Sequence, residues 1–213
     1  MSDLEKEAIE SVNEPSKEFS QSIEEDSKQE PEEEKKKRFK YGWLIELLIY
    51  VLLVVFCFTI MPRYVLQRTI VDGDSMNDTL KDGQNLWTEK VSYRFKDPSR
   101  FDIIVLYPNG RDHDEYYVKR VIGLPGETIQ ITNNTIYING KVLKENYGKN
   151  AMDTGGIAEK PLKLKDDEFF VLGDNRQISE DSRYEEVGPI KREKIDGHAF
   201  WRLYPFKDFG PID

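Results

Sequence analysis

The feature that most constrains this chain is an apolar run from Trp43 to Met61, whose nineteen residues carry one charge, Glu46. As an α-helix rising 1.5 Å per residue, the run would be about 28 Å long, close to the hydrocarbon thickness of a bilayer. Tyr41 precedes it and Tyr64 follows it, where interfacial aromatic residues belong. Glu46 lies one turn inside the near end, from which its carboxylate reaches the headgroups. The sequence predicts a transmembrane helix over residues 41–62.

This run is interpreted as a retained anchor rather than a cleavable signal peptide. A signal peptide has a shorter apolar core and small residues directly after it, whereas this run continues into Met61-Pro-Arg-Tyr64. Basic residues concentrate on the cytoplasmic side of a span. Two follow the run, Arg63 and Arg68, while five precede it: Lys35, Lys36, Lys37, Arg38 and Lys40. We therefore expect a single-pass protein of the cell membrane, with residues 1–40 cytoplasmic and residues 63–213 extracytoplasmic.

The charge of the chain is unevenly distributed. The 213 residues carry a net charge of −9, but residues 1–34 hold thirteen acidic and three basic side chains, so this segment carries −10 and the remainder +1. The segment has few large apolar residues and is predicted to be a disordered acidic tail. An acidic chain argues against nucleic acid as a partner. The one cysteine, Cys57, lies in the apolar run, which excludes an internal disulfide and a cysteine-rich zinc site.

Residues 63–213 have the pattern of a mostly β domain. β-branched and aromatic runs are bounded by turn-forming residues, and Asn139-Gly140 is a strong hairpin signal. The expected strands are residues 101–107, 116–122, 128–132, 135–138, 141–143, 168–172 and 199–204. Outside the apolar run, the sequence has no convincing helical periodicity. We therefore expect a β catalytic domain with a small second β lobe at about residues 130–165.

Few familiar enzyme signatures are present. The sequence has no HExxH, P-loop, GxGxxG, GxSxG or SxxK pattern, and its two histidines, His113 and His198, stand in a polar loop and beside a strand. On these grounds a histidine-based triad stays open. A lysine can instead serve as the base for a serine nucleophile when burial lowers its pKa enough to leave a neutral amine. Lys119 lies within the apolar run 116–122, and Ser75 stands at a glycine-containing turn, so they are candidates for such a pair.

Four segments around these residues occur in a characteristic order. They are Gly73-Asp-Ser-Met76 with Thr79-Leu80, Arg100-Phe-Asp-Ile-Ile-Val105, Tyr117-Val-Lys-Arg-Val-Ile-Gly-Leu-Pro-Gly-Glu127, and Gly173-Asp-Asn-Arg-Gln-Ile-Ser-Glu-Asp-Ser-Arg183. Together with the anchor, they make the chain resemble the bacterial type I signal peptidases, in particular the short single-span form of Gram-positive bacteria. The resemblance covers nearly all of residues 43–204 and leaves the acidic tail outside.

The resemblance implies a serine endopeptidase that removes signal peptides from secreted preproteins, without a cofactor or a metal. It implies that Ser75 is the nucleophile, that the Ser75 backbone N–H is an oxyanion donor, and that Lys119 is the general base. Ser179 matches the serine that orients the lysine amine. The supporting residues it implies are Asp174, Arg120, Asp181, Arg183 and Met76, of which the four charged ones are interpreted as scaffold ion pairs and Met76 as packing beneath the nucleophile.

The same resemblance implies where the substrate lies and which partners surround the enzyme. An extended peptide is expected beside residues 69–73 and 115–118, adding a strand through backbone hydrogen bonds. Val71, Gly73 and Val118 would border shallow pockets that admit small side chains, giving cleavage after small-x-small sites. The expected partners are secretory preproteins and the lipid bilayer, at a position near the protein export channel.

The sequence departs from the family pattern at two positions. Asp78 stands where a proline usually precedes the equivalent of Thr79, so the turn after the nucleophile differs. Gly73 stands where some relatives have a serine whose hydroxyl donates to the oxyanion. Since loss of one such donor costs on the order of 10²-fold in rate, a second donor is needed and the sequence does not assign it.

Three other functions compete with the peptidase. An inactive relative that assists surface assembly is expected to have lost the nucleophile or the base, and this chain has both. A soluble self-cleaving repressor also uses a serine and a lysine on a β scaffold, but the apolar run and the lack of a DNA-binding segment oppose it. A tethered binding module without catalysis stays open.

Overall fold

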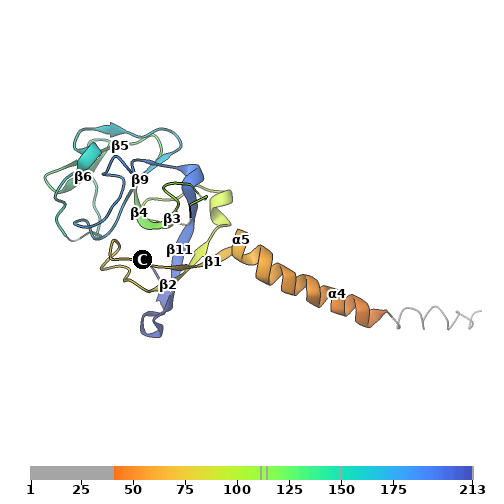
Figure 1. Ribbon diagram of the computed structural model, residues 1–213. Coiled ribbons are helices and arrows are strands. Elements are labelled where there is room, and N and C mark those ends of the chain that lie inside the picture. Colours follow the sequence, from red (N-terminus) through yellow and green to blue (C-terminus); the bar gives the residue numbers. More distant parts are fainter. Residues whose placement is uncertain (1–40, 111, 114, 149, 213) are drawn as a thin grey trace, which may run out of the picture. The chain divides into compact units, whose positions relative to one another are not determined.

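The computed structural model describes residues 41–110, 112–113, 115–148 and 150–212 (Figure 1). The disorder and the basic cluster predicted for residues 1–40 lie outside the described residues. The chain divides into two compact units after Val54.

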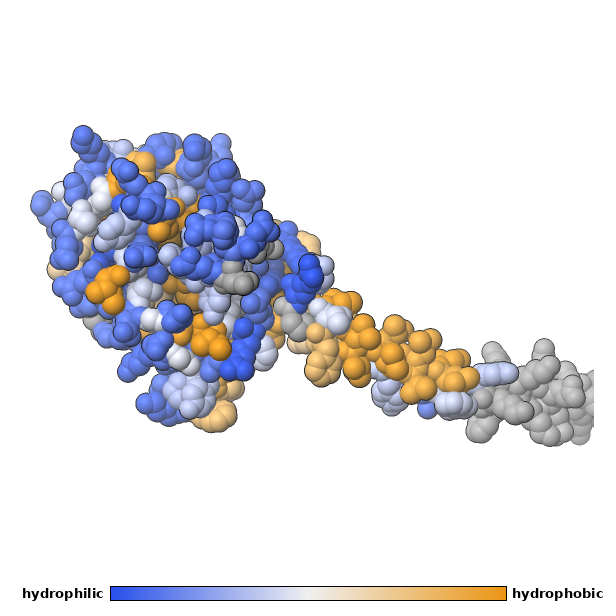
Figure 2. Space-filling model, viewed as in Figure 1, coloured by the Kyte–Doolittle hydropathy of each residue, from blue (hydrophilic) through white to orange (hydrophobic). Residues whose placement is uncertain are grey.

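The apolar run is helical. Helix α4 spans Gly42–Val55, a π-helical turn follows at Phe56–Ile60, and α5 spans Met61–Tyr64. The segment Gly42–Ile60 is long and apolar enough to cross a membrane, and none of it is buried inside the protein. Figure 2 shows its surface as predominantly hydrophobic. These properties agree with the transmembrane helix expected over residues 41–62.

The larger sheet carries the segments that contain the candidate site. Its strands are Leu66–Ile70 (β1), Asn85–Glu89 (β2), Ile103–Leu106 (β3), Tyr117–Gly123 (β4), Glu168–Leu172 (β9), Ile190–Lys191 (β10), Ile195–Tyr204 (β11) and Gly210–Pro211 (β12). They run in the order β1-β2-β11-β3-β4-β9-β10, with β12 paired to β11, and the pairings are antiparallel. β1 is an edge strand, and β4 pairs with β9 only from Arg120 onward.

The smaller sheet follows β4 in the chain. It consists of Thr128–Thr132 (β5), Thr135–Ile138 (β6), Lys141–Val142 (β7) and Leu162–Lys163 (β8), in the order β7-β6-β5-β8. Asn139 and Gly140 link β6 to β7 with positive φ angles of 50° and 76°, as a type I′ hairpin turn requires. The sheet thus occupies nearly the same residues as the second lobe expected at about 130–165.

Seven strands lie where the sequence indicates, but the two-residue strands β8, β10 and β12 were not expected, and neither were the longer β1 and β2. Their sequences, Leu-Gln-Arg-Thr-Ile and Asn-Leu-Trp-Thr-Glu, are too polar to resemble the β-branched and aromatic runs elsewhere. They form because they pair with each other in five-residue register and because β2 also pairs with β11. Tertiary pairing therefore overrides weak local propensity.

Three hydrophobic clusters form the core. One supports the candidate nucleophile and contains Val71, Met76, Leu80, Leu86, Ile103, Val105, Val118 and Ala199. The other two gather residues of β3, β4, β9 and β11 and residues of the smaller sheet. Leu86 and Tyr93 are buried, whereas Phe95 is 85% exposed.

Candidate active site

Ser75 stands on a turn that begins directly after β1. Gly73 has a φ of 81°, which favours glycine, and its backbone N–H donates to Asp82 Oδ1 at 2.9 Å. The turn closes through backbone hydrogen bonds from Asn77 N–H to the Asp74 carbonyl and from Leu80 N–H to the Met76 carbonyl, at 3.1 and 2.8 Å. Met76 itself is 1% exposed and belongs to the cluster beneath the turn.

Lys119 extends from β4 to this turn. Its Nζ donates to Ser75 Oγ at 2.8 Å, so the two residues form the pair that their sequence context indicates. Lys119 is 4% exposed. Burial, which disfavours the ammonium form, lowers the Lys119 pKa from 10.5 to about 8, while the carboxylates of Asp181 and Glu180 oppose this shift and the Arg183 guanidinium adds to it. A substantial fraction of the amine is therefore neutral near physiological pH.

The turn after β9 packs behind the nucleophile. Asn175 N–H donates to the Ser75 carbonyl at 3.0 Å, and a Cβ added to Gly173 would lie less than 3.0 Å from both that carbonyl oxygen and Ser179 Oγ. Ser179 is 1% exposed, and its hydroxyl has no hydrogen-bond partner among the described residues. The structure thus brings Ser179 to the site but without a hydrogen bond to Lys119, and its orienting role stays a prediction.

The four charged supporting residues form two buried ion pairs. Arg120 Nε and Nη2 donate to Asp174 Oδ1 and Oδ2 at 2.9 and 2.8 Å, and Thr79 Oγ1 donates to Asp174 Oδ2 at 2.5 Å. Arg183 Nε donates to Asp181 Oδ1 at 2.8 Å, and Asp181 Oδ2 accepts the Gly173 N–H at 3.1 Å. The Arg120–Asp174 pair ties the segment after β9 to β4, whereas the Asp181–Arg183 pair braces that segment internally, and the scaffold role of both pairs stays a prediction.

Sequence reasoning did not assign a role to Arg176. Its Nε donates to the Gly173 carbonyl at 3.0 Å, and its two terminal nitrogens donate to the Glu145 carboxylate at 2.8 and 2.9 Å. The guanidinium of Arg120 lies 3.5 Å from the Tyr147 ring centroid. Glu145 precedes Arg176 by 31 residues, and Tyr147 follows Arg120 by 27. Because the partners are so far apart in the chain, no local pattern in the sequence could reveal these contacts.

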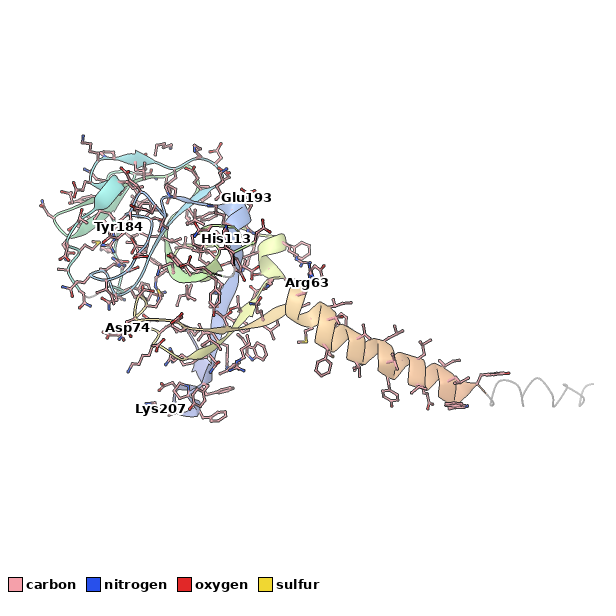
Figure 3. The ribbon with its side chains drawn as sticks, in the orientation of Figure 1. Arg63, Asp74, His113, Tyr184, Glu193 and Lys207 are labelled. Carbon is pink, nitrogen blue, oxygen red and sulfur yellow. The ribbon has the colours of Figure 1, made fainter. Side chains whose placement is uncertain are left out.

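The remaining candidate residues lie around the pair or away from it. Val71 and Val118 are 3% and 7% exposed and belong to one cluster, so the two predicted binding segments are adjacent. In the described part of the chain, the Ser75 N–H has no backbone acceptor and remains available to a ligand. His198 lies on β11, 3.8 Å from Glu89, and His113 lies on the loop between β3 and β4 (Figure 3).

Known proteins are similar to the part of the chain that contains this site. The family model described as signal peptidase, peptidase S26, matches residues 42–204. A signal peptidase I from Bacillus amyloliquefaciens is 36% identical over 188 residues, covering 85% of this chain and 97% of the relative. A signal peptidase I from Bacillus licheniformis is 32% identical over 84% of this chain and 96% of its own length.

Relatives of similar identity are also found in other organisms. A probable signal peptidase I-2 from Synechocystis is 38% identical, covering 69% of this chain and 67% of the relative. A crystal structure of a signal peptidase I from Enterococcus faecalis is 35% identical in sequence and has a TM-score of 0.37. The match covers 48% of this chain and 97% of the chain in that structure. The family model and the long sequence matches show, without that structure, that the chain belongs to the signal peptidase family S26.

Proposed function

We propose that the chain is a membrane-anchored serine endopeptidase that removes N-terminal signal peptides from secreted preproteins. The observation that carries this proposal is the 2.8 Å contact between Lys119 Nζ and Ser75 Oγ, made by a lysine whose pKa burial lowers to about 8. A serine hydroxyl becomes an effective nucleophile only when an adjacent base accepts its proton. Family membership supplies the substrate class, since curated relatives along most of the chain are named signal peptidase I.

The proposed mechanism passes through an acyl-enzyme. Neutral Lys119 accepts the Ser75 proton as Oγ attacks the scissile carbonyl carbon, and the resulting ammonium returns a proton to the leaving amine. Lys119 then accepts a proton from the water that attacks the ester carbonyl carbon, and it passes this proton to Ser75 Oγ as the ester C–O bond breaks. The Ser75 N–H stabilises the oxyanion, while Ser179, buried beside the pair, orients the amine once it turns its hydroxyl toward Lys119.

The substrate is proposed to lie extended between β1 and the start of β4. Both segments have backbone groups outside the sheet's hydrogen bonding, because β1 is an edge strand and β4 meets β9 only from Arg120. An extended peptide can add a strand there. Val71 and Val118, which are 3% and 7% exposed, are proposed to border shallow pockets, and such pockets would give a preference for small-x-small sites.

The proposed topology places the amino terminus in the cytoplasm and residues 63–213 outside. The bias of basic residues before the span supports this orientation. Ser75 follows Pro62 by 13 residues, so an extended tether reaches at most about 45 Å from the membrane boundary. The nucleophile therefore stays near the lipid bilayer, where translocated signal peptides and the export channel are also found.

The test is incubation of the purified full-length protein with a model preprotein, followed by mass spectrometry of the new amino terminus. We expect cleavage after a small-x-small site, and we expect Ser75→Ala and Lys119→Ala each to abolish it while the protein still inserts and folds. Ser99→Ala and Lys96→Ala, at exposed positions, are the matched controls and should retain full activity.

An acylating inhibitor separates an enzyme from a binding module. It should label Ser75 in the unaltered protein and fail to label Lys119→Ala. Substantial cleavage by either dyad variant, or preprotein binding without cleavage by the unaltered protein, contradicts the proposal.

A further inference from the structure

The outer edge of β1 can be identified from its hydrogen bonds to β2. Val71 N–H donates to the Gln84 carbonyl at 2.8 Å, and the Val71 carbonyl accepts Gly83 N–H at 2.9 Å, so Val71 faces β2. At the other end of the strand, the Val65 carbonyl accepts Lys90 N–H at 3.0 Å. Because backbone groups alternate in direction along a strand, Ile70 directs its N–H and carbonyl to the opposite, open edge.

The same alternation applies to the start of β4. Val121 exchanges backbone hydrogen bonds with the β3 side, through Phe101 N–H and the Asp102 carbonyl at 2.8 and 2.9 Å. Val118 and Tyr116 are an odd number of residues away and therefore direct their backbone groups to the other edge, which β9 does not reach. The two open edges together form the strand-binding groove proposed for the substrate.

One side chain connects these two edges. The hydroxyl of Tyr116, the residue before β4, donates to the Ile70 carbonyl at 2.8 Å. The ring of Tyr116 packs against the cluster that contains Val71 and Val118, and its edge faces Tyr107 with centroids 6.3 Å apart. The Tyr116 hydroxyl therefore occupies the Ile70 carbonyl oxygen, a hydrogen-bond acceptor on the open edge of β1.

We infer that Tyr116 is a gating residue of the peptide groove, whose hydroxyl must leave the Ile70 carbonyl before an extended peptide pairs there. The inference rests on the proposed function, because it takes the groove as the site of the signal peptide. An incoming backbone N–H and the phenol O–H compete for the same carbonyl oxygen. The gate thus selects an extended peptide whose backbone N–H can donate to the Ile70 carbonyl. It weakens the binding of any peptide that cannot replace the hydrogen bond from the Tyr116 hydroxyl to that carbonyl.

The test removes only the hydroxyl. Tyr116→Phe should lower KM for a model preprotein by about threefold, the size expected for losing one partly exposed hydrogen bond, with little change in kcat. Tyr137→Phe on β6 is the matched control and should leave both constants unchanged. A signal peptide whose amide at this point is N-methylated should bind more weakly than the unmodified peptide to the protein with Tyr116 present.

Binding measured without turnover separates this inference from the proposed function. In a Ser75→Ala background, fluorescence anisotropy of a labelled signal peptide should give an about threefold lower Kd with Tyr116→Phe. An unchanged or higher Kd overturns the gate even if the preprotein is cleaved normally. A lower Kd with no cleavage by the unaltered protein supports the gate and refutes the peptidase, and no binding by any variant refutes both.

Discussion

The pKa of Lys119 leads to a quantitative prediction for the pH dependence of cleavage. With a pKa of about 8 rather than 10.5, about 9% of the amine is neutral at pH 7 instead of about 0.03%, a gain of about 300-fold in free base. Because only the neutral amine accepts the Ser75 proton, kcat/KM should rise about tenfold per pH unit below pH 8 and level off above it.

The assay is steady-state cleavage of a model preprotein by the full-length protein in detergent, from about pH 6 to about pH 10. Circular dichroism at each pH separates a change in protonation from unfolding. A rate that has not levelled off by about pH 10, as the ordinary lysine pKa of 10.5 would give, or no ionisation between about pH 7 and about pH 9, refutes the argument that burial prepares Lys119 as the base.

A second perturbation tests the cause of the inflection rather than its position. The Glu180 carboxylate raises the Lys119 pKa, so Glu180→Gln should move the inflection to lower pH and increase the rate below it. Glu186→Gln, also an exposed glutamate of this segment but absent from the groups that shift the Lys119 pKa, is the control and should leave the profile in place. An upward movement in Glu180→Gln contradicts the electrostatic argument.

Three further substitutions test packing and charge around the pair. Gly173→Ala introduces a Cβ that must displace the Ser75 carbonyl, and we expect a loss on the order of 10²-fold in kcat/KM. Near-normal cleavage would show that the close approach of Gly173 to the Ser75 carbonyl is not critical. Asp174→Ala leaves the Arg120 guanidinium buried without its carboxylate and should cost about 3–5 kcal/mol in chemical denaturation; a cost below about 1 kcal/mol contradicts the assignment as a scaffold pair. Lys119→Met should stabilise the inactive protein by about 3 kcal/mol at pH 7, because the folded state holds the amine at a lower pKa than the unfolded state. This gain should shrink as the pH rises from 8 toward 10.5 and vanish above it, and a gain independent of pH would assign it to packing alone.

The sequence predicts those features whose physical cause is local. An apolar run of membrane length forms the helix Gly42–Ile60, and an Asn-Gly pair forms the β6–β7 hairpin. Lys119 is notable in the sequence because an ammonium group is costly inside a buried strand, and the same cost lowers its pKa in the structure. In each case the composition of a few neighbouring residues determines the result.

Features that depend on distant partners could not be predicted in this way. β1 becomes a strand only through β2, although it forms one wall of the proposed groove. The Glu145–Arg176 pair and the Tyr116 hydrogen bond to Ile70 join residues 31 and 46 positions apart. Such contacts are fixed by the topology of the sheets, which hydrophobic periodicity does not specify.

The turn after the nucleophile shows how a departure from the family pattern is accommodated. Asp78 stands where the resemblance predicts a proline, and a proline would fix φ and reduce the number of conformations that the turn can adopt. In its absence, the segment is held at both ends: Asn77 and Leu80 donate backbone hydrogen bonds within the turn, and Thr79 donates its hydroxyl to Asp174. That carboxylate is itself held by a buried guanidinium, so the restraint comes from the ion-pair scaffold. The polar network behind the site therefore restrains the turn that carries Ser75, the residue whose Oγ contacts Lys119 Nζ.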